Sequence, residues 1–321
     1  MTGPTWATLE DGRAHFQHGP TDLIITIDAA PEVVEAGLAA GWMVFETLLE
    51  GLVVDLDMLR SDVEVLPSAE VVECSTSTAT QMVEAAKQVA TGGFLTPMAA
   101  VAGSIADTVC QAITDVVADA DADADAMADS GPSADTESAG GMWRVIVNNG
   151  GDISLALGQG ASLTVGIVDL STGARLGSVN VDHDHNVRGV ATSGRGGRSL
   201  SMGIADSVTV LASSAALADA AATRIASAVD LDGFEDDRLV HRRPANEIDG
   251  ATELEDRLVV VGVEPLTLAQ QDLALKAGGR VASRLIENKT ITAAYLKLDQ
   301  RCLVMDQKRS ALSPSPAGIL T

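Results

Sequence analysis

Val187–Val229, VRGVATSGRGGRSLSMGIADSVTVLASSAALADAAATRIASAV, is the segment from which the fold is predicted. Its β-branched residues at Ser207–Val210 predict a strand, and the alanine-rich residues 215–228 predict a helix. A glycine-rich loop, Ser193–Ser199, separates this strand from an earlier one at Gly189–Thr192. The segment therefore predicts strand, loop, strand and helix in one continuous unit.

The loop Ser193–Ser199 has a composition that suits phosphate binding. Its three glycines let backbone amides approach an anion closely, and Arg195 and Arg198 carry guanidinium groups that bind phosphate. The same composition is typical of a solvated turn. The loop by itself therefore leaves a pyrophosphate site and a plain turn as alternatives.

Asp219 and Thr223 stand four residues apart and so share one face of the predicted helix. Carboxylate and hydroxyl oxygens are hard ligands of the kind that Mg²⁺ prefers. A solvated or capping pair is the alternative for these two residue types on an alanine-rich helix. Because the helix and the loop belong to one short unit, we expect the two to serve one site.

The composition indicates an acidic protein with an aliphatic core. Of its 321 residues, 46% are hydrophobic but only 2% are aromatic, so small and aliphatic side chains must fill the core. The net charge of −24 argues against a nucleic-acid-binding surface. Three cysteines, Cys74, Cys110 and Cys302, form no CxxC motif, which argues against a zinc site or a disulfide framework.

The N-terminal residues show neither the basic region nor the apolar region of a secretory signal. No later segment is expected to be apolar enough to span a bilayer. The sequence therefore predicts a cytoplasmic protein without membrane contact.

Hydrophobic residues recur at helical spacing over Pro31–Arg60, and further helices are predicted over Thr78–Ala90 and from Met98 to about Ala118. The turn Asn149–Asp152 separates two predicted strands and is a hairpin signal, although its polar side chains also suit a ligand contact. Together these elements predict an α+β fold of mixed, mainly antiparallel sheets flanked by helices.

Residues 1–263 are expected to form the main domain, and residues 264–321 a small C-terminal appendage with a loose tail. Residues 119–140 are low in complexity, and 115–137 contain eight acidic and no basic residues. Such a segment has little to bury, so we expect a disordered acidic insertion over 119–140.

Two groups of histidines are candidate ligands. His15 and His18 flank a Gly-Pro turn, and a surface pair is the favoured interpretation. His183 and His185 alternate with aspartates in a loop between two strands. Ligands on such a loop are poorly preorganised, so a solvated loop is favoured over a metal site.

Four ordered motifs carry a family resemblance: TPMAAVAGSIAD at Thr96–Asp107, VNNGGDI at Val147–Ile153, VATSGRGGRS at Val190–Ser199 and ADSVTVLASSAALADAAAT at Ala205–Thr223. Over roughly Arg13–Val263 the chain resembles the ApbE superfamily, and most closely a shorter bacterial and archaeal branch of it. The resemblance implies an ApbE-like fold. It also implies FAD:protein FMN transfer, with Mg²⁺ on the pyrophosphate and a threonine or serine of an acceptor protein as the target.

The resemblance further implies site residues at matching positions. Asp219 and Thr223 match the metal-binding pair of an Ala-Asp-x-x-x-Thr helix. Ala106, followed by Asp107, matches an alanine whose carbonyl faces the metal. Together with the loop residues considered above, the implied contacts to the flavin or nucleotide are Asn149, Gly150, Gly151, Asp152, Thr192, Ser193, Gly194, Arg195, Arg198 and Ser199.

The sequence departs from the transferases in two places that concern the reaction. Their His-Ile-Ile-Asp-Pro-x-Thr-Gly stretch has no counterpart, because only Arg198–Gly203 occupies that space, without a histidine. The lysine expected before their Gly-Tyr-Ala motif is replaced by Ala102. No catalytic base is therefore identified.

We expect a protein that binds FAD, FMN or a related nucleotide pyrophosphate with Mg²⁺. An FMN-transferase-like enzyme, a non-catalytic flavin- or nucleotide-binding module, and an accessory protein in sulfur assimilation to homocysteine are the alternatives. The sequence leaves open whether an acceptor protein takes part and whether the chain forms a homo-oligomer.

Overall fold

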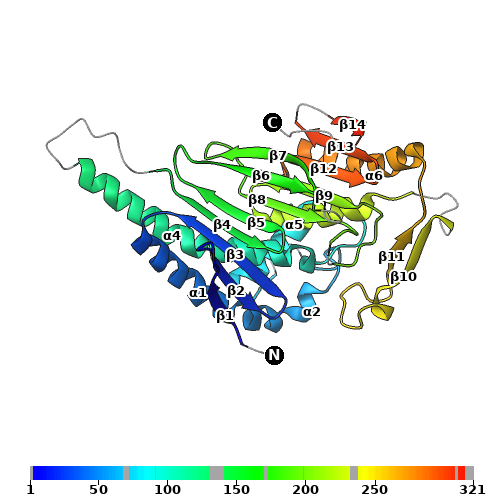
Figure 1. Cartoon of the computed structure of the whole chain (residues 1–321). Coiled ribbons are helices and arrows are strands. Elements are labelled where there is room, and N and C mark those ends of the chain that lie inside the picture. The colour runs from blue at the N-terminus through cyan, green and yellow to red at the C-terminus, as the bar shows by residue number, and fades with distance from the viewer. Residues whose placement is uncertain are drawn as a thin grey trace.

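A ten-stranded antiparallel sheet is the central element of the fold (Figure 1). The computed structural model describes residues 3–67, 72–90, 92–129, 141–169, 173–197, 199–231, 238–307 and 310–314. Figure 1 shows the long helices lying against one face of this sheet. In sheet order the strands are β1 (Thr5–Thr8), β2 (Ala14–His18), β3 (Thr21–Asp28), β4 (Arg144–Asn149), β5 (Asp152–Leu157), β8 (Gly189–Ser193), β9 (Ser207–Ala212), β12 (Ala293–Leu298), β13 (Arg301–Asp306) and β14 (Ser310–Pro314).

Six α-helices and two further hairpins complete the described part of the chain. The hairpin β6–β7 and the hairpin β10–β11 each form a separate two-stranded sheet. The bounds of these elements are α1 (Pro31–Val54), α2 (Leu56–Leu59), α3 (Ser77–Val89), the 3₁₀-helix η1 (Pro97–Ala100), α4 (Val101–Asp129), β6 (Ser162–Val168), β7 (Arg175–Asp182), α5 (Ala215–Ala228), β10 (Val240–Pro244), the 3₁₀-helix η3 (Ala245–Glu247), β11 (Leu258–Val263) and α6 (Leu268–Glu287).

The large sheet uses one topology twice. In each half a hairpin is followed by helices and then by a second hairpin: β2–β3, α1 to α4 and β4–β5 in the first, and β8–β9, α5 to α6 and β12–β13 in the second. The halves join where β5 pairs with β8. This arrangement brings α4 and α5 together beneath the middle of the sheet.

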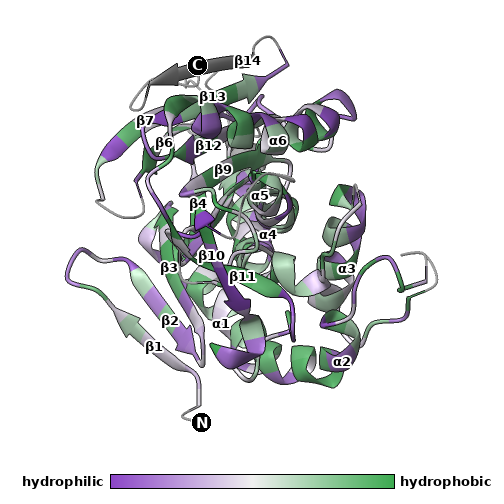
Figure 2. Ribbon diagram, turned by 90° about the vertical axis from the view of Figure 1, so that its right-hand side faces the viewer, coloured by the Kyte–Doolittle hydropathy of each residue, from purple (hydrophilic) through white to green (hydrophobic). Residues whose placement is uncertain are grey.

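The main core lies between the sheet and the helices, and Figure 2 shows hydrophobic residues concentrated there along α4 and α5. A smaller core lies on the other face of the sheet, where β6 and β7 cover β5, β8, β9, β12 and β13. Tyr295 of β12 is completely buried in this second core. The predicted α+β class with mainly antiparallel sheets is therefore correct.

Helices α1 and α4 pack closely because of small residues. A Cβ atom at Gly41 would lie 2.8 Å from Cγ1 of Ile113. By length and composition alone, Pro31–Val54 and Pro97–Ala124 are apolar enough to cross a membrane, contrary to the expectation from the sequence. Alanine raises the hydropathy of these helices, glycine permits their close packing, and core helices of soluble proteins meet the same criterion.

The boundary expected at residue 263 is wrong. Strand β12 lies between β9 and β13 in the large sheet, and α6 packs against α5 and β13. All six residues of β9 are buried, so its backbone groups need a hydrogen-bonded strand on each side, and β12 supplies the second. The C-terminal part is therefore an integral part of the sheet as far as Pro314. The loose tail expected over residues 310–321 is wrong for 310–314, which form β14, and residues 315–321 lie outside the described residues.

The disorder expected over residues 119–140 is wrong for residues 119–129, which continue α4. Alanine, which alternates with aspartate there, is the strongest helix former. The Asp121 carboxylate also accepts hydrogen bonds from Gly141 N at 2.9 Å and from Trp143 Nε1 at 3.3 Å. Figure 1 shows this end of α4 projecting beyond the sheet; residues 130–140 lie outside the described residues.

Candidate functional site

The first turns of α4 and α5 contact each other and cap each other. Gly103 N donates a hydrogen bond to Asp219 Oδ2 at 3.0 Å. In return, Ala215 N and Ala216 N donate to Oδ1 and Oδ2 of Asp107 at 3.0 and 2.8 Å. Each helix therefore supplies an aspartate from its second turn to the unpaired N–H groups of the other helix.

The close approach requires a glycine on α4. A Cβ atom at Gly103 would lie 2.2 Å from the carbonyl oxygen of Ala215. Ser214 caps α5 from its own chain by accepting a hydrogen bond from Leu217 N at 3.2 Å. The small residues in TPMAAVAGSIAD are thus explained by this helix contact.

The ionised form of the Asp219 carboxyl group is strongly disfavoured in the folded protein. Burial raises its pKa well above the ordinary value, and the nearby charge of Asp152 raises it further, while the N–H groups of Gly103 and Ala102 act in the opposite direction. Two carboxylates near each other in a poorly solvated place favour either a proton or a cation between them. The capping interpretation of Asp219 is therefore correct, but it does not account for the second carboxylate.

Asp219 and Thr223 both line a polar pocket of about 160 Å³. The Thr223 hydroxyl lies 3.4 Å from Ser193 Oγ, and Thr192 N donates to Asp152 Oδ1 at 3.3 Å. The pocket thus joins α5, the end of β8 and the β4–β5 turn. Its polar lining residues are Thr96, Asp152, Thr192, Ser193, Ser199, Asp219, Thr223, Ser227 and Glu253.

A larger apolar chamber of about 930 Å³ adjoins this pocket. Leucines of α1 and α2 and methionines of α3 and η1 form much of its wall, and the β4–β5 turn and the glycine-rich loop close one end. Asn149 Nδ2 donates to the carbonyl oxygen of Ala102 at 3.1 Å, which fixes that turn against α4. The residues that line both cavities are Met98, Val101, Ala102, Asp152, Thr192, Gly197 and Ser199.

Most of the residues expected from the sequence lie in these joined cavities. Asp219 and Thr223 line the polar pocket, and Ala106 lines neither cavity because it is fully buried one turn beyond Ala102, which lines both. The expected ligand contacts found in the joined cavities are Asn149, Gly150, Gly151, Asp152, Thr192, Ser193, Gly194 and Ser199.

Of the two arginines of the glycine-rich loop, the structure describes Arg195, and its contacts do not support the phosphate interpretation. Arg195 lines a different cavity and pairs with Asp206, Nη2 lying 2.6 Å from Oδ1. In that cavity Lys297 also bridges Asp169 and Asp206, at 3.0 and 3.6 Å. Arg198 lies outside the described residues.

Two lining residues were missed from the sequence. His18 lines the apolar chamber and is only 7% exposed, so the expected surface pair with His15 is wrong. The alternation of Ala14, Phe16 and His18 on one face of β2 was the available signal. Glu253 comes from the loop between β10 and β11, far along the chain, and no local signal places it here.

The loop that carries Glu253 is held over the polar pocket. The Arg257 guanidinium lies 3.4 Å above the ring of Phe94, which itself lines the pocket. Arg60 Nη2 donates to the carbonyl oxygen of Ala251 at 2.9 Å. Glu253 makes no hydrogen bond or ion pair with another residue in the described part of the chain.

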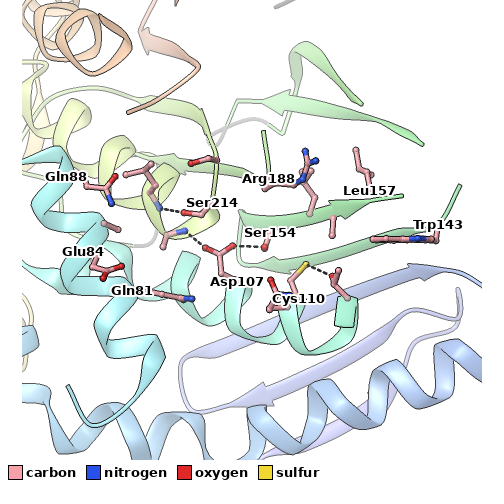
Figure 3. Close-up of a pocket in the computed structure, with 18 residues that line it drawn as sticks. Gln81, Glu84, Gln88, Asp107, Cys110, Trp143, Ser154, Leu157, Arg188 and Ser214 are labelled. Atoms are coloured by element: carbon pink, nitrogen blue, oxygen red, sulfur yellow. Dashed lines mark hydrogen bonds between the residues drawn. The ribbon is translucent and has the colours of Figure 1, made fainter. Parts of the chain in front are cut away.

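A second polar cavity, of about 500 Å³, lies beside the start of α5 and shares no lining residue with the joined cavities. Figure 3 shows Asp107 there between Ser154 and α5. Its carboxylate is occupied by the Ser154 hydroxyl at 2.6 Å and by the α5 amides. Burial raises the pKa of the Cys110 thiol to about 12, and Arg188 donates to three carbonyl oxygens. We therefore place the candidate site in the joined cavities.

No three His, Cys, Asp or Glu side chains, among those that the structure describes, lie close enough together to hold a metal ion. His183, from the aspartate–histidine loop, directs its Nδ1 to the carbonyl oxygen of Leu157 at 2.8 Å. A cation in the polar pocket would need oxygen ligands from a bound molecule as well as from Asp219 and Thr223.

Comparison with known proteins gives a family match over most of the chain. A family model described as AbpE bacteria matches residues 6–125 and 116–305. The solved structure of the ApbE protein from Thermotoga maritima MSB8 is 11% identical, with 97% of each chain covered and a TM-score of 0.39. The apo form of Pseudomonas stutzeri flavinyl transferase ApbE is 12% identical, covers 98% of this chain and 96% of that chain, and has a TM-score of 0.32. No curated protein matches the chain.

Proposed function

The chain belongs to the family described as AbpE bacteria, and we propose that it binds a flavin nucleotide, FAD or FMN, together with a divalent cation. The observation that carries this proposal is the junction of two cavities of unlike polarity. A flavin nucleotide has a flat ring with apolar faces and a charged phosphate part. The chamber of about 930 Å³ suits the ring, and the polar pocket suits the phosphate part.

The cation follows from the charges of the polar pocket. Asp152, Asp219 and Glu253 line it, and no lysine or arginine does so among the described residues. These carboxylates would repel a pyrophosphate, and an accompanying cation would offset that repulsion. Mg²⁺ held by Asp219 and Thr223 fits this site, because burial and the nearby charge of Asp152 raise the pKa of Asp219 and a bound cation would stabilise its ionised form. When bound, Mg²⁺ neutralises charge on the pyrophosphate.

The chain itself supplies the shape of the site. Gly194 has a φ of +128°, and a Cβ atom there would lie 2.9 Å from the carbonyl oxygen of Asp206. Gly151 N donates to Asn148 Oδ1 at 2.8 Å, which holds the β4–β5 turn in place. These two glycine-containing turns orient backbone groups at the junction of the cavities, where the ring and the phosphate part of the ligand would meet.

A transferase needs a group that accepts the proton of the attacking hydroxyl. No histidine lines the polar pocket among the described residues, and Glu253 is the lining carboxylate that has no partner there. Glu253 is therefore the candidate base if the protein transfers FMN from FAD to an acceptor hydroxyl. Without such an acceptor the same site serves as a binding module.

Titration calorimetry of the purified protein with FAD and with FMN, each with and without Mg²⁺, tests binding. We expect FAD to bind, and to bind more tightly with Mg²⁺. Chromatography of the FAD mixture, with and without a candidate acceptor protein, then tests turnover: released AMP supports the transferase, and intact bound FAD supports the binding module. Absence of binding of either flavin under all conditions would overturn the proposal.

A further inference from the structure

His18 is a buried polar side chain that lacks a hydrogen bond. Its Nδ1 is buried and has no partner among the described residues, and its Nε2 lies 3.7 Å from Glu50 Oε1, too far for a hydrogen bond. His15, three residues earlier on the opposite face of β2, is instead more exposed, and its Nε2 lies 2.5 Å from Asp22 Oδ1. Buried polar groups without partners are uncommon because they lose their interactions with water.

The position of His18 in the fold indicates where a hydrogen-bonding partner for its side chain would have to lie. The residue ends β2 and lies in the wall of the apolar chamber, whose lining surface is mostly apolar. Phe45 packs edge-on against its ring, with 6.4 Å between the ring centroids. Since no hydrogen bond fixes the imidazole and rotation about its χ2 is broad, a nitrogen can turn towards the chamber.

We propose that His18 recognises the bound ligand by a hydrogen bond to the polar edge of a heteroaromatic ring in the apolar chamber. This inference rests on the proposed function, because it needs a ring in that chamber. It selects rings with hydrogen-bonding atoms at their edge, such as the isoalloxazine, over purely hydrocarbon rings. His18 is thereby a specificity-determining residue in the apolar chamber, whereas Asp219 and Thr223 line the polar pocket.

The test separates the ring from the phosphate part. Riboflavin has the ring without phosphate, ADP has a pyrophosphate without the isoalloxazine, and FMN has ring and phosphate. His18→Phe keeps a ring of similar size but removes both nitrogens, and His18→Asn keeps a hydrogen-bonding group. His15→Gln on the same strand is the matched control. Flavin fluorescence and calorimetry, all with Mg²⁺, give the affinities.

We expect His18→Phe to weaken binding of riboflavin and FMN by about 3- to 10-fold, the loss of one hydrogen bond, and to leave ADP unchanged. His18→Asn should recover part of the loss, and His15→Gln should match the wild type. The absorption band of bound FMN should also differ between His18→Phe and the wild type. Thermal melting confirms that each variant is folded, and His18→Leu, which also removes both ring nitrogens, replaces His18→Phe if that variant does not fold.

Three results would overturn the inference. Equal flavin affinity of His18→Phe and the wild type would show that His18 does not contact the ring. An equal loss for ADP would show that it acts on the fold. If the wild type bound ADP with Mg²⁺ but did not bind riboflavin, the apolar chamber would not be the site of the ring, although the protein would still bind a nucleotide. Failure of the wild type to bind any of the three ligands would instead remove the proposed function, and this inference with it.

Discussion

At the scale of single residues, Asp219 combines two tasks in one carboxylate. It caps α4 through Gly103 N and also lines the polar pocket near Asp152. Capping fixes the carboxylate in position, and burial beside a second acid makes its negative charge unfavourable. The geometry of the site and the stability of the helix contact therefore depend on the same side chain.

Asp219→Asn should change how stability depends on pH. The pKa of Asp219 is raised in the folded state, so the folded protein binds its proton more tightly than the unfolded chain does. Stability contributed by this group is therefore present at low pH and falls as pH rises from the ordinary aspartate range through the raised pKa. The variant should flatten this fall in metal-free thermal melts.

The same variant should abolish the Mg²⁺-dependent part of nucleotide binding, because an amide lacks the charge that the cation requires. Calorimetry with FAD and Mg²⁺ measures this loss. Asp184→Asn, in an exposed loop away from the joined cavities, is the control. If Asp219→Asn and the wild type showed the same change of melting temperature with pH and the same calorimetric binding of FAD and Mg²⁺, the carboxylate would only cap α4.

Cys110 should be inert in the native protein. The thiolate is the reactive form of cysteine, and with the pKa raised to about 12 only roughly one thiol in ten thousand is ionised at pH 8. Alkylation with iodoacetamide at pH 8, followed by peptide mass spectrometry, should label Cys110 only after unfolding. Labelling of native Cys110 as fast as the more exposed Cys74 would contradict its burial.

At the scale of elements, the contact between the first turns of α4 and α5 organises the site. Asp107 and Asp219 exchange caps across it, and the polar pocket and the cavity at the start of α5 lie around the same helix pair. Each helix end thus satisfies its partner's backbone donors without water. A change in the spacing of the two helices would move Asp219 relative to Asp152.

Gly103→Ala should test this contact. The added methyl group would lie 2.2 Å from the Ala215 carbonyl oxygen, so α4 and α5 must move apart. Overpacking of this kind destabilises by about 1–3 kcal/mol, and the weakened Asp219 cap adds to it. Denaturant unfolding measures the free energy. Gly166→Ala, at a site with nothing within 4 Å of the added Cβ, should be nearly neutral; an equal loss in both variants would argue against a special contact at Gly103.

At the scale of the whole molecule, the two halves of the large sheet depend on each other. The candidate site takes α4 and the β4–β5 turn from the first half and α5, β8 and the glycine-rich loop from the second. Strand β12, near the C-terminus, pairs with β9, the buried strand that precedes α5. The chain must therefore be folded nearly to its end before the site is complete.

A chain that ends at Val263 should not fold cooperatively. It would lack β12 and α6, which leaves one side of β9 without hydrogen bonds and opens both cores. Circular dichroism during thermal melting should show no sharp transition for this chain, whereas the full chain should show one. A cooperative transition of the shorter chain would restore the two-part organisation expected from the sequence.

The local elements of this protein are determined by the sequence itself. The β-branched residues of β9, the alanines of α5, the glycine-rich loop and the Asn149–Asp152 turn lie where periodicity and turn chemistry place them. These features depend on neighbours in the chain, so they can be predicted from the sequence alone. The Asp219 and Thr223 pair was found in the same way, because helical spacing puts both on one face.

Only the tertiary structure decided which partners these residues have. Arg195 has the chemistry of a phosphate ligand, but a carboxylate eleven residues later neutralises it; the exchange of caps between Asp107 and Asp219 joins residues more than a hundred positions apart. His18 became part of a chamber wall because β2 faces α1, and β12 joined the main sheet because β9 needed a second neighbour. Local alternation, as on β2, can indicate that a residue is buried, but the partners that it meets arise from packing between distant segments, which no local pattern specifies.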